Sequence, residues 1–303
     1  MKDQRTPRAR PLRRAAALSA VLAGSLLFAG CAGAPSPLEA YSDTVLVEAP
    51  TPEIAAMSPV TGSVSGGDVV TITGVSLDTV TAVTFGGEPA TDVTVVSATE
   101  LAVVAPRATN YQQATASVEL LADGEPVRAA SELTFTWTSV TPVDKQLEYA
   151  FQHWDRPNYN LASFGTFNPV GGDCVNFVSQ TLLARGWEMT DAWHNRNSGT
   201  EWTGAWIHVP TFDTWLRANQ ESLGVRELTI EQRDQVKVGD IVMFDWNLNN
   251  SLDHTQIVSD VEVVDGKTII KMVGHNTDSN WRDLDATITV DHPGGYVFFW
   301  SVS

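Results

Sequence analysis

Basic residues and cysteines are both scarce in this chain of 303 residues. Nineteen lysines and arginines stand against 36 acidic residues, and the two cysteines are Cys31 and Cys174. A negative field repels phosphate groups, so the charge balance argues against a nucleic-acid partner. The sequence also contains no His-Glu-x-x-His pattern, no paired-cysteine spacing, no Gly-x-Ser-x-Gly elbow and no glycine-rich phosphate loop. We therefore predict neither a metal nor a cofactor.

The first 30 residues have the layout of an export signal. Six basic residues and one acidic residue precede the short apolar stretch AAALSAVLAGSLLFAG, and Cys31 follows it. Residues 28–31, Phe-Ala-Gly-Cys, resemble the bacterial lipobox, in which the cysteine is lipidated and becomes the mature N-terminus. We therefore predict a lipoprotein signal peptide over 1–30 and an extracytoplasmic protein that is lipid-anchored to the cell membrane through Cys31. An ordinary cleaved signal would instead make the protein secreted.

Removal of residues 1–30 leaves 13 basic and 35 acidic residues, a net charge of −22. The Ala-, Pro- and Ser-containing residues 31–50 show no sustained period, which predicts a flexible tether. The remaining length is typical of two domains. If Cys31 is lipidated, Cys174 has no cysteine left for an intramolecular disulfide. A leftover thiol in an exported protein indicates intermolecular pairing or a reactive role, although buried inert cysteines are also common.

Residues 51–137 alternate β-branched or aromatic residues with small or polar ones, in runs such as VVTITGVSL, TAVTFGG and ELTFTW. Gly, Pro and Asp separate the runs at roughly ten-residue intervals, which predicts a β-sandwich. The stretches SPVTGSVSGGDVVTITG (58–74), VTFGG (83–87) and APRA (105–108) resemble the IPT/TIG family. That resemblance implies an immunoglobulin-like sandwich used as a spacer or a surface-binding module.

Residues 143–303 hold nine of the ten tryptophans, all six histidines and Cys174. Their mixture of helical and strand-like patterns predicts an α+β domain. The apolar stripe of VNFVSQTLLAR predicts a buried helix that ends at Gly186. Asp173 is a preferred N-cap residue, so Cys174 is expected in the first turn, where the helix dipole favours a thiolate. A backbone N–H at this helix start could stabilise an oxyanion.

The candidate base is His254, which opens the strand-like run HTQIVSDVEVV. Asp265-Gly266 predicts a two-residue hairpin turn, and KTIIKMVGHNT is the return strand. If Val264 faces Lys267, the residue numbers of every facing pair sum to 531. His254 and His275 then lie on one face of the sheet.

In this register Asn276 points to the other face, and a β-bulge in either strand would reverse the two assignments. A nucleophile, a base and a base-orienting group are the parts of thiol catalysis. We therefore predict Cys174 as nucleophile, His254 as base and His275 as orienting group, with Asn276 as the fallback for the third role. Asp173 is predicted as support for the oxyanion site and the helix cap.

Five segments around these residues resemble the bacterial putative amidase domain family and, more distantly, the NlpC/P60 and CHAP peptidases: NYNLASFGTFNPVGGDCVNFVSQTLLARGW, WTGAWIHVPTFDTWL, KVGDIVMF, DHTQIV and VGHNTDS. The resemblance implies a papain-like thiol hydrolase of amide or peptide bonds in the cell wall. Cys174 matches the nucleophile, His254 the base and His275 the third, polar position. Family members commonly carry Thr or Ser after that last histidine, where this chain has Asn276.

The sequence thus predicts a multidomain protein: a signal peptide (1–30), a tether (31–50), an all-β Ig-like sandwich (51–137) and an α+β papain-like domain (143–303). The predicted function is an exported cysteine amidase or peptidase whose partner is peptidoglycan or another amide substrate. It would meet the membrane only through its lipid anchor. The alternative is a non-catalytic lipoprotein that binds the cell wall or another surface and keeps the fold as a scaffold.

Overall fold

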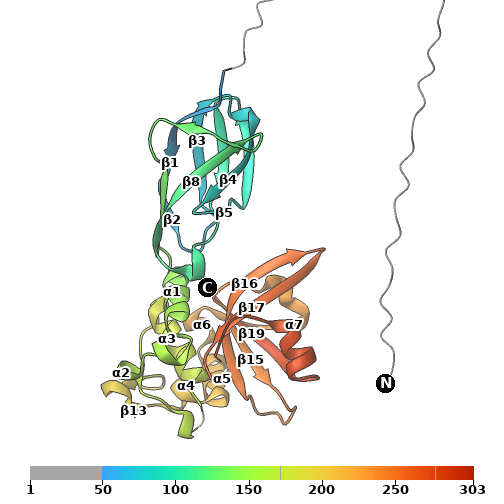
Figure 1. Cartoon of the computed structure of the whole chain (residues 1–303). Coiled ribbons are helices and arrows are strands. Elements are labelled where there is room, and N and C mark those ends of the chain that lie inside the picture. Colours follow the sequence, from blue (N-terminus) through green and yellow to red (C-terminus); the bar gives the residue numbers. More distant parts are fainter. Residues whose placement is uncertain (1–49, 171, 277) are drawn as a thin grey trace, which may run out of the picture. The chain divides into compact units, whose positions relative to one another are not determined.

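A computed structural model of the chain describes residues 50–170, 172–276 and 278–303 (Figure 1). The predicted signal peptide, Cys31 and the tether as far as residue 49 lie outside these residues. The described residues fall within one compact unit, Glu48–Ser303. None of the helices in these three ranges is long and apolar enough to cross a membrane.

Two sheets packed face to face form the N-terminal domain, as the alternating pattern predicted (Figure 1). One sheet has the strand order β10-β1-β3-β7-β6; the other has the order β2-β11-β8-β4-β5, with β9 paired to β8. The strands are β1 (Glu53–Ser58), β2 (Thr61–Ser63), β3 (Val69–Val75), β4 (Val80–Phe85), β5 (Glu88–Pro89), β6 (Asp92–Ser97), β7 (Glu100–Val104), β8 (Ala114–Ala122), β9 (Glu125–Pro126), β10 (Arg128–Ala129) and β11 (Thr134–Thr138).

Period-2 alternation explains this sandwich, because successive strand residues point to opposite faces. In β3, Val70 and Ile72 are fully buried while their neighbours are partly or fully exposed. Phe135 and Trp137 of β11 alternate in the same way and pack their rings edge to face, 5.3 Å apart. A 3₁₀ turn, Thr109–Tyr111, lies between β7 and β8.

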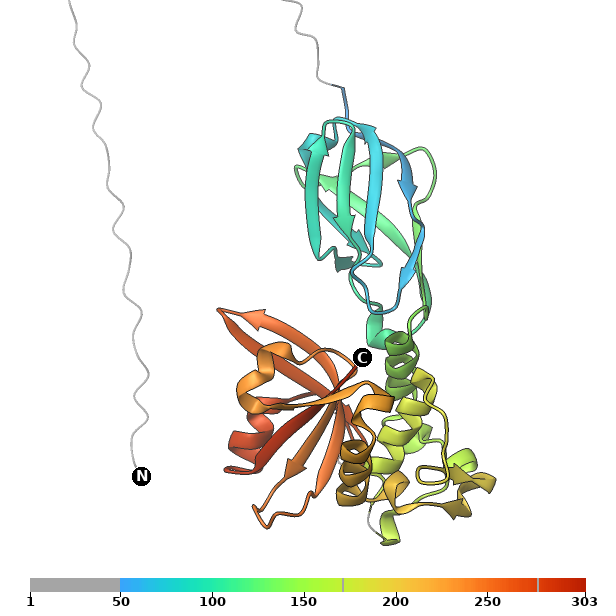
Figure 2. The same cartoon turned by 180° about the vertical axis from the view of Figure 1, so that it is seen from behind.

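The C-terminal domain mixes helices with one six-stranded antiparallel sheet, order β14-β19-β15-β16-β17-β18 (Figure 2). Its helices are α1 (Pro142–His153), α2 (Leu161–Phe164), α3 (Cys174–Arg185), α4 (Gly204–Ile207), α5 (Val209–Ala218), α6 (Gln220–Leu223) and α7 (Leu284–Ala286). Its strands are β12 (Asn195–Arg196), β13 (Glu201–Trp202), β14 (Val225–Thr229), β15 (Ile241–Asp245), β16 (His254–Val264), β17 (Lys267–Gly274), β18 (Ser279–Asp283) and β19 (Tyr296–Val302), of which β12 and β13 pair only with each other.

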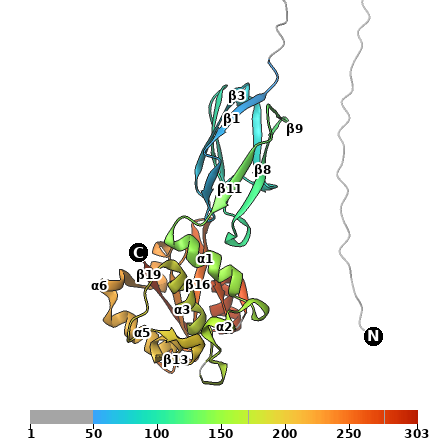
Figure 3. The same cartoon turned by 90° about the vertical axis from the view of Figure 1, so that its left-hand side faces the viewer.

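The sheet separates two apolar layers. One face packs against α3 and α1, which lie on each other (Figure 3), and includes Met243 and Ile257. The opposite face packs against α7 and includes Phe244 and Val258. Strand residues therefore alternate between a layer that contains Cys174 and a layer that does not.

Helix α3 begins and ends where the sequence predicts. Its first residue is Cys174, its apolar side chains are buried, and Gly186 follows in a left-handed conformation with φ 112°. Glycine adopts that conformation without steric cost, and the N–H of Gly186 bonds back to the carbonyls of Leu182 and Leu183. The helix thus presents its first turn, with the thiol, to the sheet.

Candidate functional site

The Cys174 thiol lies buried in the first turn of α3, with only 3% of the residue exposed. Three backbone N–H groups point to it: those of Thr255, Val175 and Cys174 itself. Burial raises the pKa of the thiol to about 11, and the three N–H groups only partly counteract it. The helix N-terminus was expected to favour a thiolate, but here desolvation outweighs its field.

Asp173 occupies the N-cap position but does not cap the helix. Its carboxylate instead accepts hydrogen bonds from the backbone N–H of Phe167 at 2.7 Å and from the Thr166 hydroxyl. The Asn176 side chain donates a third bond at 3.2 Å. The predicted helix-cap role is thus corrected: the Asp173 carboxylate is hydrogen-bonded to Thr166 and Phe167 of the loop before the thiol and to the Asn176 side chain, and not to the helix's own N–H groups.

Gly172 brings a second side chain to this turn. Its φ is 107°, and a Cβ built there would lie 2.6 Å from Nδ2 of Asn276. The bare glycine backbone therefore lets Asn276 approach the segment just before Cys174. Asn276 itself is exposed, lies in the turn after β17, and has a φ of 81°.

His254 is the first residue of β16 and is 5% exposed. It pairs with Phe244 of β15, and its ring centroid lies 5.8 Å from that of Trp246. Burial, with the nearby charges of Arg282 and His292, lowers the pKa of His254 to about 3. The imidazole is therefore neutral at pH 7, as a general base must be. Its Nε2 is buried without a hydrogen-bond partner among the described residues.

The hairpin register decides which side chain stands opposite His254. Val264 pairs with Lys267 as predicted, and the pairs sum to 531 as far as Asp260 and Lys271. Val258 then pairs with Met272, so Ser259 is an extra residue, a β-bulge, and the sum becomes 530.

The bulge overturns the prediction that His254 and His275 share a face. A one-residue shift moves every later side chain to the opposite face. In the shifted register Gln256 stands opposite Gly274, where a Cβ would meet the Gln256 side chain at 2.5 Å. β17 ends at Gly274, so His275 and Asn276 lie in the turn beyond the paired residues. Extended past that end, the shifted register would bring Asn276, the predicted fallback, opposite His254.

His275 lies on the α3 side of the sheet. Its ring stacks on Tyr159 with centroids 4.0 Å apart and lies 6.2 Å from Phe177 of α3. Its Nδ1 is 2.9 Å from the Trp154 carbonyl and 3.0 Å from a carboxylate oxygen of Asp278. His275 is therefore near the start of α3 but apart from the ring of His254.

The structure brings the thiol to the start of β16, because the N–H that reaches it belongs to the residue after His254. No hydrogen bond within the described ranges joins the thiol to the His254 ring. A pocket of about 320 Å³ opens beside the same turn, and Asp173, Thr166, Tyr159 and His275 help to line it. The three ranges contain no group of three or more side chains able to hold a metal ion.

Sequence reasoning missed Tyr159, Thr255 and Asp278. Tyr159 supports His275 from a stretch without any periodic pattern, and Gln180 donates a hydrogen bond to its hydroxyl at 3.1 Å. Thr255 acts through its backbone N–H, which no side-chain pattern reveals. Asp278 follows His275 by three residues, a spacing that becomes informative only when a turn is known there.

Comparison with known proteins gives matches for both domains. Residues 52–136 match the IPT/TIG domain. Residues 143–298 match the family described as putative amidase domain. An uncharacterized protein of Bacillus subtilis, YhbB, is 26% identical over 117 residues, which are 37% of this chain and 35% of that protein. The chain thus matches about a third of the length of that relative.

Solved structures give weaker likenesses. SGBP-B from a xyloglucan utilization locus of Bacteroides uniformis is 26% identical over 29% of this chain and 23% of its own, with a TM-score of 0.24. SGBP-B from Bacteroides ovatus, solved with a mixed-linkage heptasaccharide, is 9% identical over 83% of this chain and 52% of its own, with a TM-score of 0.25. The family match spans more than half of the 303 residues, and on that ground the chain belongs to the putative amidase domain family.

Proposed function

We propose that this protein is an exported cysteine amidase or peptidase that hydrolyses amide bonds through an acyl-enzyme. Family membership supports the reaction class. One observation supports the nucleophile: the Cys174 thiol lies in the first turn of α3 and faces the N–H of Thr255, directly after His254. A helix-borne cysteine beside a strand-borne histidine is the arrangement of papain-like hydrolases.

In this mechanism His254 takes the proton from Sγ of Cys174 while the sulfur attacks the amide carbon. The backbone N–H of Cys174 donates a hydrogen bond to the oxyanion that forms. The C–N bond then breaks, His254 returns the proton to the departing amine, and a thioester remains. Water that loses a proton to His254 cleaves the thioester, which releases the acid and restores the thiol.

The resting charges determine the order of these events. The raised pKa of Cys174 and the lowered pKa of His254 leave both groups neutral at pH 7. Proton transfer therefore accompanies the attack and does not precede it. In the free protein the imidazole packs against Phe244 and Trp246, in the layer that does not contain Cys174. The proposed mechanism therefore requires the ring to move around the start of β16 to reach Sγ when substrate binds.

Asn276 takes the third role in this proposal in place of His275. In support of this, extension of the register after the Ser259 bulge beyond the end of β17 would bring Asn276, and not His275, opposite His254. The Asn276 amide also lies against Gly172, two residues before the thiol. Its carbonyl oxygen can accept a hydrogen bond from an imidazole N–H and so fix the tautomer.

Peptidoglycan is the proposed substrate, and a lipid anchor at Cys31 is the proposed link to the membrane. Both rest on the export signal and on the resemblance to cell-wall hydrolases. In this arrangement the IPT/TIG domain holds the amidase domain away from the membrane surface.

Digestion of purified peptidoglycan by the full-length protein tests the mechanism. Wild type should release new amino groups, and Cys174→Ala and Cys174→Ser should release none above background. Equal release by wild type and Cys174→Ala would refute the thiol mechanism. No release by any of them, together with tight binding to the wall, would favour the non-catalytic surface-binding protein.

Cys31→Ala is the matched control, since it removes the other cysteine of the chain. It should leave the rate of amide hydrolysis unchanged and release the protein from membranes after expression in a bacterial host. Retention on the membrane would contradict the lipid anchor without touching the catalytic proposal.

A further inference from the structure

The β-bulge at Ser259 takes that residue out of the residue pairing with β17. Ser259 is fully buried, and the residue on either side of it pairs with β17 while Ser259 does not. A buried carbonyl without a partner is destabilising, so such groups are nearly always hydrogen-bonded. The partner here comes from the other domain: the hydroxyl of Tyr111 donates to the Ser259 carbonyl at 2.6 Å.

Tyr111 reaches that carbonyl from an unfavourable backbone conformation. Tyr111 and Asn110 before it are both left-handed, with φ of 55° and 51°. A bulky residue rarely adopts this conformation, and it persists where surrounding contacts stabilise it. The contacts are present, because Tyr111 is 2% exposed and its ring packs against those of Phe151 of α1 and Trp281 of β18, with centroids 5.2 and 5.9 Å away.

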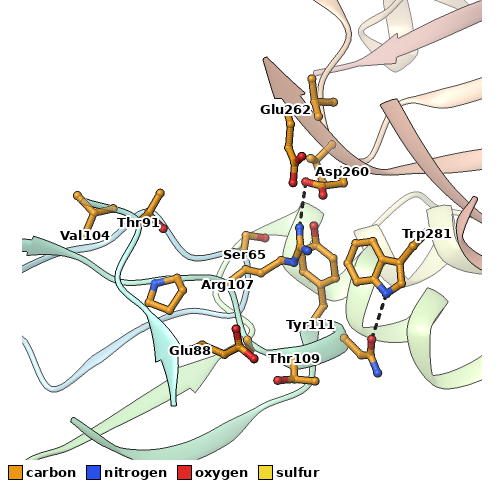
Figure 4. A pocket seen from close by; sticks show the side chains of 16 residues that line it. Ser65, Glu88, Thr91, Val104, Arg107, Thr109, Tyr111, Asp260, Glu262 and Trp281 are labelled. Atoms are coloured by element: carbon orange, nitrogen blue, oxygen red, sulfur yellow. Dashed lines mark hydrogen bonds and ion pairs between the residues drawn. The ribbon is translucent and has the colours of Figure 1, made fainter. Parts of the chain in front are cut away.

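A second contact holds the residue after the bulge (Figure 4). Nη1 of Arg107 lies 2.9 Å from a carboxylate oxygen of Asp260, and its guanidinium carbon lies 4.2 Å from the ring of Trp281. Two residues of the IPT/TIG domain, Arg107 and Tyr111, therefore bind two successive residues of β16. Burial also raises the pKa of Tyr111, so its hydroxyl remains a donor at any physiological pH.

We propose that Tyr111 of the IPT/TIG domain is a positioning residue for the amidase site. By satisfying the Ser259 carbonyl it stabilises the bulge, and the bulge fixes the register of the inner half of the hairpin, which ends at His254. Without the bulge the inner half would pair in the register of the outer half, and the side chain of His254 would move relative to the turn that follows β17. The IPT/TIG domain is then part of the catalytic apparatus and more than a spacer. This inference rests on the proposed function for its catalytic consequence, but the register it predicts is measurable without any activity.

Tyr111→Phe in the full-length protein tests the inference, because it removes the hydroxyl and keeps the ring. We expect kcat for amide release to fall about tenfold with KM little changed, as the loss of one buried hydrogen bond would allow. In NMR spectra the cross-strand contact between Ile257 and Val273 should weaken, and a contact between Ile257 and Gly274 should appear. The pH at which iodoacetamide labels Cys174 half-maximally should also shift, since the thiol's surroundings depend on the start of β16.

Ser65→Ala is the matched control. It removes another hydrogen bond between the same two domains, from the Ser65 hydroxyl to Asp144 of α1, without touching β16. It should leave kcat, the cross-strand contacts and the labelling profile unchanged. Wild-type contacts, labelling and kcat in Tyr111→Phe would overturn the inference, and so would equal changes in both variants. If wild type hydrolyses no amide, the proposed function fails, while the cross-strand contacts still decide the role of Tyr111.

Discussion

The hairpin of β16 and β17 has two halves that differ in register, burial and surroundings. Near the turn, Asp260 to Val264 pair with Lys267 to Lys271, and Val263 is 71% exposed. Beyond Ser259 the pairing is shifted by one residue, and residues 254–258 are buried between two apolar layers. The turn therefore sets the register of the outer half, whereas side-chain packing sets the register of the inner half.

The difference shows which forces set a strand register. A two-residue turn with left-handed Asp265 and Gly266 (φ 51° and 77°) fixes the pairs next to it. Far from the turn, the burial of the correct face contributes more free energy than the register that the turn favours. A bulge then lets the two halves of the hairpin pair in different registers. The four predictions that follow test this contrast, from the largest expected effect to the smallest.

The two histidines at the inner end should differ most. His254→Ala removes the proposed base and should lower kcat/KM for amide hydrolysis by roughly 10³- to 10⁴-fold. His275→Ala, on the other face, should cost about tenfold or less, through the support it gives the loop at Trp154. Steady-state kinetics on one amide substrate compares them, and a larger loss in His275→Ala would reverse the assignment of the two faces.

Burial of His254 should make the folded state sensitive to acid. Its pKa is lowered to about 3 from an ordinary 6.5, so the unfolded chain binds the proton more readily between these values. The stabilisation is complete above pH 6.5 and is lost as the pH falls toward 3, by roughly 3–5 kcal/mol in total. Urea unfolding of wild type and His254→Gln at a series of pH values measures it. The variant should show the shallower decline, and parallel curves would count against the buried neutral imidazole.

Gly172→Ala compares the inner site with the outer turn. Alanine at a φ of 107° is strained, and its Cβ would collide with the Asn276 amide. We expect a loss of roughly 2–3 kcal/mol in the free energy of unfolding. Gly266→Ala is the control, since its φ is 77° and no atom lies within 4 Å of its added Cβ. It should cost about 1 kcal/mol by denaturant unfolding and leave hydrolysis unaltered. Equal costs at the two glycines would show that Asn276 can move aside freely.

Two isosteric substitutions in β16 should give the smallest effects. Val263→Thr on the exposed outer half should change the free energy of unfolding by less than about 0.5 kcal/mol. Val258→Thr, fully buried in the inner half, should cost roughly 1–3 kcal/mol because its hydroxyl enters an apolar layer. Thermal or urea unfolding measures the free energy of unfolding of each variant. Similar losses in the two variants would show that the two halves do not differ in burial.

Much of the fold could be predicted because its signals are local. The alternation in residues 51–137, the apolar stripe after Cys174 and the Asp265-Gly266 turn each act over a few residues, and each element formed. The family resemblance extended this to the candidate residues. The predicted cap at Asp173 was wrong because Thr166 and Phe167 compete for its carboxylate, and a local motif contains no information about such competitors.

The pKa of the Cys174 thiol is a second property that the sequence could not predict. The position of the thiol at the helix start was predictable, but its pKa was not, since burial by the surrounding layers raises it against the helix dipole. The burial of one side chain depends on every element packed around it. The sequence order of those elements says little about how deep the thiol lies.

The sequence by itself determined a two-domain chain with an Ig-like sandwich, a helix that begins at Cys174 and a hairpin that turns at Asp265-Gly266. Only the tertiary structure decided that His254 and His275 lie on opposite faces of the sheet. Both registers satisfy the same period-2 pattern, so the pattern cannot choose between them. The structure makes the choice with a β-bulge at Ser259, whose carbonyl accepts a hydrogen bond from Tyr111, 148 residues earlier in the chain.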